Sequence, residues 1–150
     1  MDTFDPQMAQ RVWQRVRSVQ QPEDEAAGLP ALIAENLEAS AAYLQLARRF
    51  SGRHNATLRR LSEESLAHAA CLKGIYTLLT EEFAAIDAPA VAGATTLALL
   101  RLCCGKALGR LRRYEQWAAH DEFGPVFALL ARQLQEHCKA LPELLGSLGK

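Results

Sequence analysis

The sequence predicts an all-α protein: a bundle of four long helices that follows one short helix. Leucine and alanine dominate the 150 residues, and glycine and proline are sparse outside a few short stretches. Apolar residues recur at every third or fourth position, which is the spacing of one face of an α-helix. This spacing extends over residues 5–19, 31–50, 56–80 and 94–119, and over the segment that begins at Pro125. We therefore predict an N-terminal helix and linker in residues 1–28 and one helical domain in residues 29–150.

Cap and breaker residues mark several of these helix ends. Asp5 followed by Pro6 is typical of a cap and a first helical turn, and Pro125 is expected at the first position of the last helix. Asn55, which ends the "SGRHN" turn, is the expected N-cap of the helix over 56–80. Pro142 removes a hydrogen bond inside the last helix, so that helix should kink or break beyond His137.

The connection between the helices over 56–80 and 94–119 decides which bundle topologies are possible. Fully extended at about 3.3 Å per residue, it reaches roughly 40 Å. The helix before it is about 36 Å long at 1.5 Å per residue. The connection can therefore just cross the whole bundle, which permits an up-down-down-up arrangement with one long crossover.

The periodicity also predicts which side of each helix faces the core. On the helix over 56–80 the inward positions are Leu58, Leu61, Ser65, His68, Leu72, Ile75 and Leu79. On the helix over 94–119 they are Leu97, Leu100, Cys104, Leu108 and Leu111. Arg110, Arg112 and Arg113 are expected to form a solvated end of the bundle, because charged side chains are rarely buried.

Charge and hydropathy argue against several classes of function. The 17 basic and 17 acidic residues balance, which argues against binding to nucleic acid or to an anionic membrane through net charge. No apolar run approaches the roughly 18 residues of a membrane span, and the N-terminus lacks the apolar region and cleavage pattern of a signal peptide. We expect a cytoplasmic protein. Its cysteines, Cys71, Cys103, Cys104 and Cys138, form no CxxC pair and are expected to be buried structural thiols.

An internal repeat relates the two halves of the domain. A shift of 69 residues superposes "LRRLSEESLAHAACL" on "FALLARQLQEHCKAL", and it places His68 on His137. Each half is thus a helical hairpin with one histidine on the inner side of its second helix. The repeat predicts a pseudo-twofold bundle in which both imidazoles face inward.

These blocks resemble the ferritin-like superfamily, in particular its small rubrerythrin-related domains. The matching segments are "ENLEASAAYLQLARRF", "EESLAHAACLKGIYTLLT", "YEQWAAHDEFGPVFALLA" and "QEHC", and they extend over nearly all of the chain after about Leu29. The resemblance implies a ferritin-like four-helix bundle. It also implies two iron or manganese ions, held by a glutamate from the first helix of each hairpin and a Glu-x-x-His pair from the second.

The second helices depart from this ligand pattern. His68 and His137 match the family's histidines, but the glutamate expected three residues earlier is Ser65 in one half and Leu134 in the other. Glu64 precedes His68 by four residues and so shares a helix face with it. A π-bulge could bring such a shifted carboxylate back into register.

The first helices depart from the pattern as well. The family glutamate commonly lies seven residues before a tyrosine, and counting back from Tyr43 leads to Asn36, with Glu35 beside it. The 69-residue shift places Cys104 and Gly105 opposite Glu35 and Asn36. Two divalent cations held by imidazoles alone in an apolar core would leave their charge uncompensated.

Three interpretations of the histidine pair follow. The candidate metal ligands are His68, His137, Glu64 and Glu35. The histidines can be neutral core residues hydrogen-bonded to Ser65, to Asn36 or to each other. They can instead hold a single metal, for which zinc suits the mixed ligands best, or a complete pair of metals with shifted ligands.

The function we predict is that of a ferritin-like, rubrerythrin-related protein with a degenerate two-metal site and a non-catalytic binding or structural role. On this interpretation the chain has no catalytic or cofactor-binding residue, requires no cofactor and forms a homodimer or binds another protein. The alternative is a di-iron or single-metal oxidoreductase with shifted ligands that reduces peroxide or oxidises iron. Iron, manganese or zinc would occupy the candidate site in that case.

Overall fold

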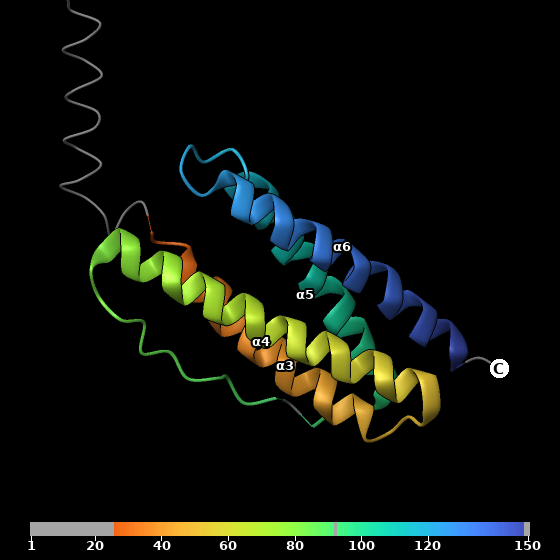
Figure 1. Ribbon diagram of the computed structural model, residues 1–150. Helices are drawn as coiled ribbons and strands as arrows, with labels where there is room; N and C mark the ends of the chain where they lie inside the picture. Colours follow the sequence, from red (N-terminus) through yellow and green to blue (C-terminus); the bar gives the residue numbers. More distant parts are fainter. Residues whose placement is uncertain (1–25, 92, 149–150) are drawn as a thin grey trace, which may run out of the picture.

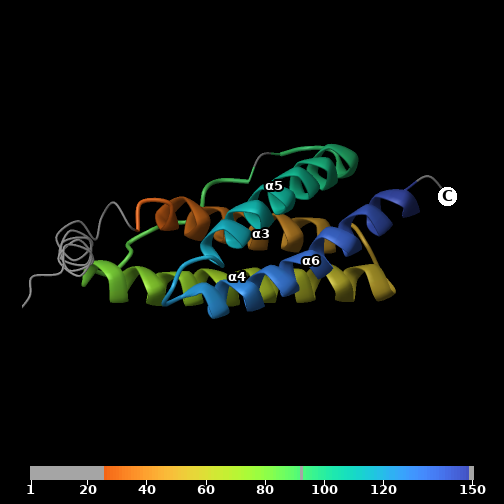
Figure 2. The same ribbon diagram turned by 90° about the horizontal axis from the view of Figure 1, so that it is seen from above.

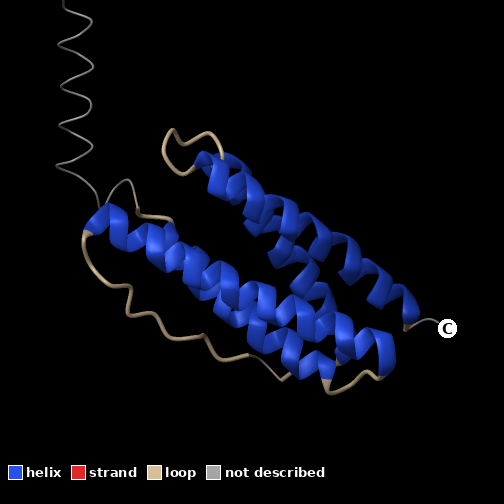
Figure 3. Cartoon of the chain, viewed as in Figure 1, coloured by secondary structure: helices blue, strands red, loops and turns tan. Residues whose placement is uncertain are grey.

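The computed structural model describes residues 26–91 and 93–148, and within them the chain forms four α-helices and no strand (Figures 1 and 3). The helices are α3 (Leu29–Ala47), α4 (Gly52–Thr80), α5 (Thr96–Trp117) and α6 (Gly124–Ser147). The predicted all-α class is confirmed. The short helix predicted for residues 5–19 lies outside the described residues.

The helices pair as two hairpins, α3 with α4 and α5 with α6. The hairpins pack together mainly through α3 against α5, and less extensively through α4 against α6. Figures 1 and 2 show the two hairpins side by side. The buried core residues come from all four helices. Each helix therefore has two neighbours, and side chains on its inner face reach into a common interior.

The connection from α4 to α5 contains no helix or strand among its described residues, 81–91 and 93–95. It runs along the outside of the α3–α4 hairpin toward the turn that joins those two helices (Figure 1). Arg49, just after α3, donates from Nη1 to the carbonyl oxygen of Ala94 at 2.9 Å and to Oγ1 of Thr96 at 3.2 Å. These two bonds attach the start of α5 to the end of α3.

Helix α4 begins earlier than the sequence predicted. Ser51 occupies the N-cap position and Gly52, with φ +58°, is the first residue of the helix, a backbone conformation that suits glycine. The expected N-cap Asn55 is thus wrong, since Asn55 lies within the first turn. Its Nδ2 donates at 2.7 Å to the carbonyl oxygen of Ala47, which closes the turn between α3 and α4.

Helix α6 is longer than its internal proline suggested. Pro125 lies in the first turn, and the helix passes through Pro142 and ends at Ser147. Of the expected kink or break, the break is therefore wrong. An internal proline costs about 3 kcal/mol. Leu141 and Leu144 flank Pro142 and are fully buried, and each contributes roughly 1.5–3 kcal/mol by leaving water. Their burial offsets the lost hydrogen bond.

The inner face of α4 is the one that the sequence predicted, apart from half-buried Leu79, but the inner face of α5 is not. Leu97 and Leu108, expected inside, are 41% and 48% exposed. The buried residues of α5 are Leu99, Leu100, Cys103, Ala107, Arg110 and Tyr114. Because leucines lie on more than one side of α5, their spacing alone did not indicate which side packs inward.

Of the four cysteines, only Cys103 is fully buried; the other three are half-buried. Burial raises the pKa of the Cys103 thiol to about 12, and burial likewise raises the pKa of Cys71, Cys104 and Cys138. All four therefore remain neutral thiols at pH 7, as expected of structural cysteines. None of the described helices combines the length and the apolar character needed to cross a membrane.

Candidate functional site

Two histidines lie at the centre of the bundle, one from each hairpin. His68 of α4 and His137 of α6 are each 1% exposed. Their rings are nearly parallel, with centroids 6.2 Å apart and an angle of 13° between the planes. The prediction that both imidazoles face inward is confirmed.

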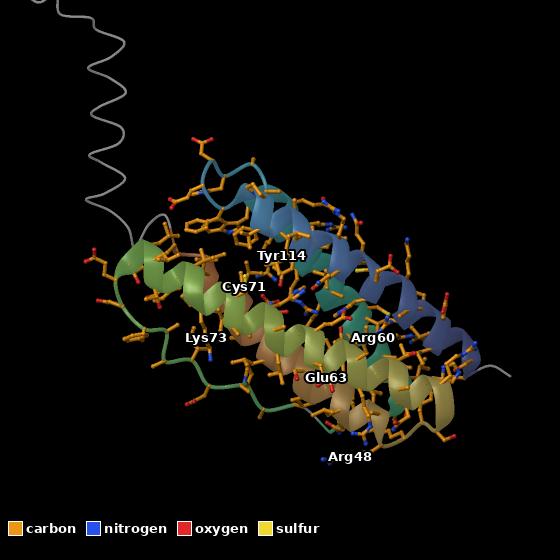
Figure 4. The ribbon with its side chains drawn as sticks, in the orientation of Figure 1. Arg48, Arg60, Glu63, Cys71, Lys73 and Tyr114 are labelled. Atoms are coloured by element: carbon orange, nitrogen blue, oxygen red, sulfur yellow. The ribbon has the colours of Figure 1, made fainter. Side chains whose placement is uncertain are left out.

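His68 belongs to a chain of hydrogen bonds that crosses the interior. Its Nε2 lies 2.8 Å from Oε1 of Gln133, an acceptor, so Nε2 carries the proton. Its Nδ1 then accepts from the hydroxyl of Tyr114 at 3.2 Å, and that oxygen in turn accepts from Nδ2 of Asn36 at 2.8 Å. Tyr114 lies between the two hairpins (Figure 4). Both ring nitrogens of His68 are therefore occupied by protein partners.

His137 is bound differently. Its Nε2 donates to Oε2 of Glu64 at 2.6 Å, and the ring meets that of Tyr43 edge-on, with centroids 6.1 Å apart. Nδ1 of His137 is buried and has no hydrogen-bond partner among the described residues. Glu64 is at the edge of the core, with its side chain 30% exposed, and its other oxygen lies 3.9 Å from Nε of Arg60.

The environment keeps both imidazoles neutral. Burial lowers the pKa of His68 and of His137, since a charged ring loses its hydration in the interior. The hydrogen bonds to Gln133 and to Glu64 oppose this effect, and the positive charge of Arg110 adds to it. The His137–Glu64 contact is therefore a hydrogen bond from a neutral imidazole to a carboxylate.

The tyrosines reveal the pseudo-twofold relation between the hairpins. Tyr43 of α3 contacts His137, and Tyr114 of α5 contacts His68, so each hairpin's first helix supplies a tyrosine to the other hairpin's histidine. The tyrosines are 71 residues apart, whereas the histidines are 69 apart. The residue seven before Tyr114 is Ala107. Ala107, rather than Cys104 or Gly105, is thus the counterpart of Asn36.

The four candidate ligands do not all converge. Glu64 contacts His137, whose ring stacks on that of His68. The carboxylate of Glu35 instead pairs with Nη2 of Arg113 at 2.5 Å. Of the neighbours Glu35 and Asn36, it is Asn36 whose side chain enters the core. Beside His68 and His137, Ser65 donates to the carbonyl oxygen of Leu61 at 2.8 Å, and Leu134 is packed in the apolar core.

Arg110 was expected at a solvated end of the bundle, and that expectation is wrong. Its side chain is 1% exposed and is the largest of the fully buried ones in the described part of the chain. Nε and Nη2 of the guanidinium have no hydrogen-bond partner among the described residues. Arg110 follows Cys103 and Ala107 and precedes Tyr114 at spacings of three and four. That register is compatible with an inward face, but the leucines on other sides of α5 follow an equally regular spacing and gave no reason to prefer it.

The residues at the centre do not fit a pair of iron or manganese ions. Such a centre needs several carboxylates to neutralise two divalent cations. Within residues 26–91 and 93–148, no three histidine, cysteine, aspartate or glutamate side chains converge on a point that could hold a metal. One carboxylate, that of Glu64, reaches this centre from its edge. The core also contains a positive charge of the protein itself, the guanidinium of Arg110.

Comparison with known proteins identifies no relative of this chain. The chain matches no protein-family model, no curated protein and no solved structure.

Proposed function

We propose that this chain is a ferritin-like, rubrerythrin-related bundle whose two-metal site has degenerated, and that it has a non-catalytic binding or structural role. The observation that carries this proposal is the buried guanidinium of Arg110 among the core polar residues. A fixed organic cation there repels further positive charge at short range, which disfavours divalent metals.

The four positions at which the rubrerythrin-related family has metal-binding carboxylates support the same conclusion. In this chain they are Asn36, Ser65, Ala107 and Leu134. None can carry negative charge. Asn36 and Ser65 instead make hydrogen bonds within the protein, to Tyr114 and to the carbonyl of Leu61. A core stabilised by such bonds needs no metal to satisfy those groups.

The arrangement of the helices supports the ferritin-like part of the proposal. The connection between α4 and α5 runs along the α3–α4 hairpin, and Arg49 attaches the start of α5 to the end of α3. These features support the proposed up-down-down-up order with one crossover. We further propose a cytoplasmic homodimer. Leu66 on α4 and Leu129 on α6, 48% and 57% exposed, offer apolar surface for such an association.

Metal content tests the proposal directly. Protein purified without chelator, and again after incubation with ferrous iron under anaerobic conditions, should contain well below one equivalent of iron, manganese or zinc per chain. Two metals about 3.5–4 Å apart would overturn the proposal in favour of a di-iron oxidoreductase with shifted ligands.

A substitution distinguishes the remaining alternative. If one zinc-like ion binds in stoichiometric amount, His68→Ala should remove it, while His54→Ala, at the half-buried His54 near the start of α4, should not. That pair of results would establish a single-metal protein. If no metal binds, His68→Leu should fold with the far-ultraviolet circular dichroism of the natural protein, because the histidine is then a core residue. Sedimentation equilibrium measures the expected dimer.

A further inference from the structure

A small cavity lies between α3 and α5, under the connection that joins α4 to α5. Its volume is about 130 Å³. Ala39 and Ala42 of α3, Val91 of the connection and Leu99 and Leu102 of α5 give it apolar walls. The same cavity is lined by Arg110. It thus combines an apolar lining with a buried cation.

Arg110 is unusual among buried charges. No carboxylate of the described residues forms an ion pair with it, and Nε and Nη2 have no hydrogen-bond partner there. An isolated charge in a protein interior is strongly unfavourable unless an opposite charge compensates it. The guanidinium presents donors in a planar fork, which matches the two oxygens of a carboxylate.

The other charges that line the cavity define the charge of its ligand. Lys106 and Glu38 form an ion pair with each other, so they neutralise one another. The raised pKa of the Cys103 thiol, due mainly to burial, keeps that lining residue neutral. The net charge around the cavity is therefore that of Arg110 alone, which one negative charge balances.

We propose that this cavity binds a short-chain aliphatic monocarboxylate, whose carboxylate accepts hydrogen bonds from Arg110 and whose hydrocarbon tail lies against Ala42, Leu99 and Leu102. The apolar walls favour an aliphatic chain over phosphate or sulfate, which would leave polar oxygens without partners. An apolar protein cavity of about 150 Å³ accommodates benzene. The 130 Å³ here suits a molecule of about the size of butyrate.

Butyrate titration into the full-length protein tests the proposal, by calorimetry and by ¹H–¹⁵N NMR. We expect saturable binding with a dissociation constant of about 1 mM or lower, and NMR shifts at residues that line the cavity. Butyramide, which has the same shape without the charge, should bind at least about tenfold more weakly, because a charge-assisted hydrogen bond contributes more than a neutral one. Equal binding of both compounds would overturn the role of Arg110.

Two matched pairs of variants locate the site. Arg110→Met should weaken butyrate binding about tenfold or more; Arg110→Lys should retain part of the affinity because it keeps the charge and loses the fork. Ala42→Leu should block binding by filling the cavity. Ala31→Leu, at an exposed position of the same helix, should leave binding unchanged.

Several results would overturn the proposal: no saturation by butyrate in the natural protein, unchanged affinity in Ala42→Leu, or formate and chloride binding as tightly as butyrate. The last outcome would indicate an anion site without a place for the tail. Metal content is measured on the same preparation. A protein that contains metal and binds butyrate contradicts only the proposed loss of the metal site, and a metal-free protein without butyrate binding contradicts only the carboxylate site.

Discussion

Lowering the pH from 7.5 to 5.5 should destabilise this protein, by at most about 2–3 kcal/mol, because two histidines are buried as neutral bases. His68 and His137 are each 1% exposed, and burial lowers the pKa of both below the ordinary value of 6.5. On unfolding, both rings enter water and recover that ordinary value. Below pH 6.5 the unfolded chain therefore binds more protons than the folded one.

The sign and size of the effect follow from this difference in bound protons. Stability rises with pH wherever the unfolded state holds more protons, so the contribution of each histidine is fully present above pH 6.5. It is lost as the pH falls from 6.5 toward the lower pKa of the folded state. For each pH unit over which the unfolded state holds one more proton than the folded state, the free energy of unfolding changes by about 1.4 kcal/mol per group. Two histidines at pH 5.5 therefore set an upper limit of about 2–3 kcal/mol on the loss, while most carboxylates are still ionised.

Urea denaturation at pH 7.5, 6.5 and 5.5, followed by circular dichroism, measures the free energy of unfolding. The double variant His68→Gln/His137→Gln should lose most of the pH dependence, whatever its absolute stability, and His54→Gln should retain it. Arg110→Met should show a smaller loss at pH 5.5, because the positive charge of Arg110 disfavours protonation of both rings.

Two results would refute this reasoning. One is a free energy of unfolding that stays constant between pH 7.5 and 5.5 or declines equally in the double variant. The other is an NMR titration of the ring protons that gives either buried histidine a pKa of 6.5 or higher. In that case the Glu64 hydrogen bond, and not burial, would dominate the environment of His137.

Three further predictions concern stability at neutral pH, and urea denaturation measures each. Gly124→Ala should destabilise the protein by about 2 kcal/mol or more, because a Cβ there would lie 2.5 Å from the carbonyl oxygen of Ala118. Gly105→Ala, where a Cβ meets nothing within 4 Å, should instead stabilise α5 by about 0.5–1 kcal/mol. The same loss of stability in both variants would contradict the argument from close approach at Gly124. Tyr114→Phe should cost about 1–3 kcal/mol, since it leaves buried partners unsatisfied, and an unchanged stability would mean that water replaces the hydroxyl. Glu81→Gly should stabilise by about 0.5–1 kcal/mol, because Glu81 ends α4 with φ 60°, and a lower stability would show that the entropy of glycine in the unfolded chain dominates.

Much of the fold could be predicted because local patterns agree with one another. On α4, His68 shares one face with Leu58, Leu61, Leu72 and Ile75, so the direction of the imidazole followed from periodicity alone. The 69-residue repeat extended the same inference to His137. The end of α4 and the start of α6 lie close to their predicted positions for the same reason.

The candidate site could be predicted only in part. Glu35 and Asn36 are adjacent, and one position rotates a side chain by about 100° around a helix. In the structure Asn36 enters the core and Glu35 pairs with Arg113. The partners of the histidines come from other helices: Tyr114 from α5, Gln133 from α6 and Glu64 from α4. Sequence spacing contains no information about such contacts between helices.

The sequence by itself determined the helical class and the inward direction of both histidines, because those features depend on periodicity along a single chain segment. The pairing of the long helices into hairpins followed from the 69-residue repeat. Only the tertiary structure decided that Arg110 and Tyr114 lie in the core and that a cavity reaches Arg110 between α3 and α5. Leucines on several sides of α5 leave its inner face ambiguous. The packing of α3 and α6 against it selects that face, and with it the charge at the centre of the bundle.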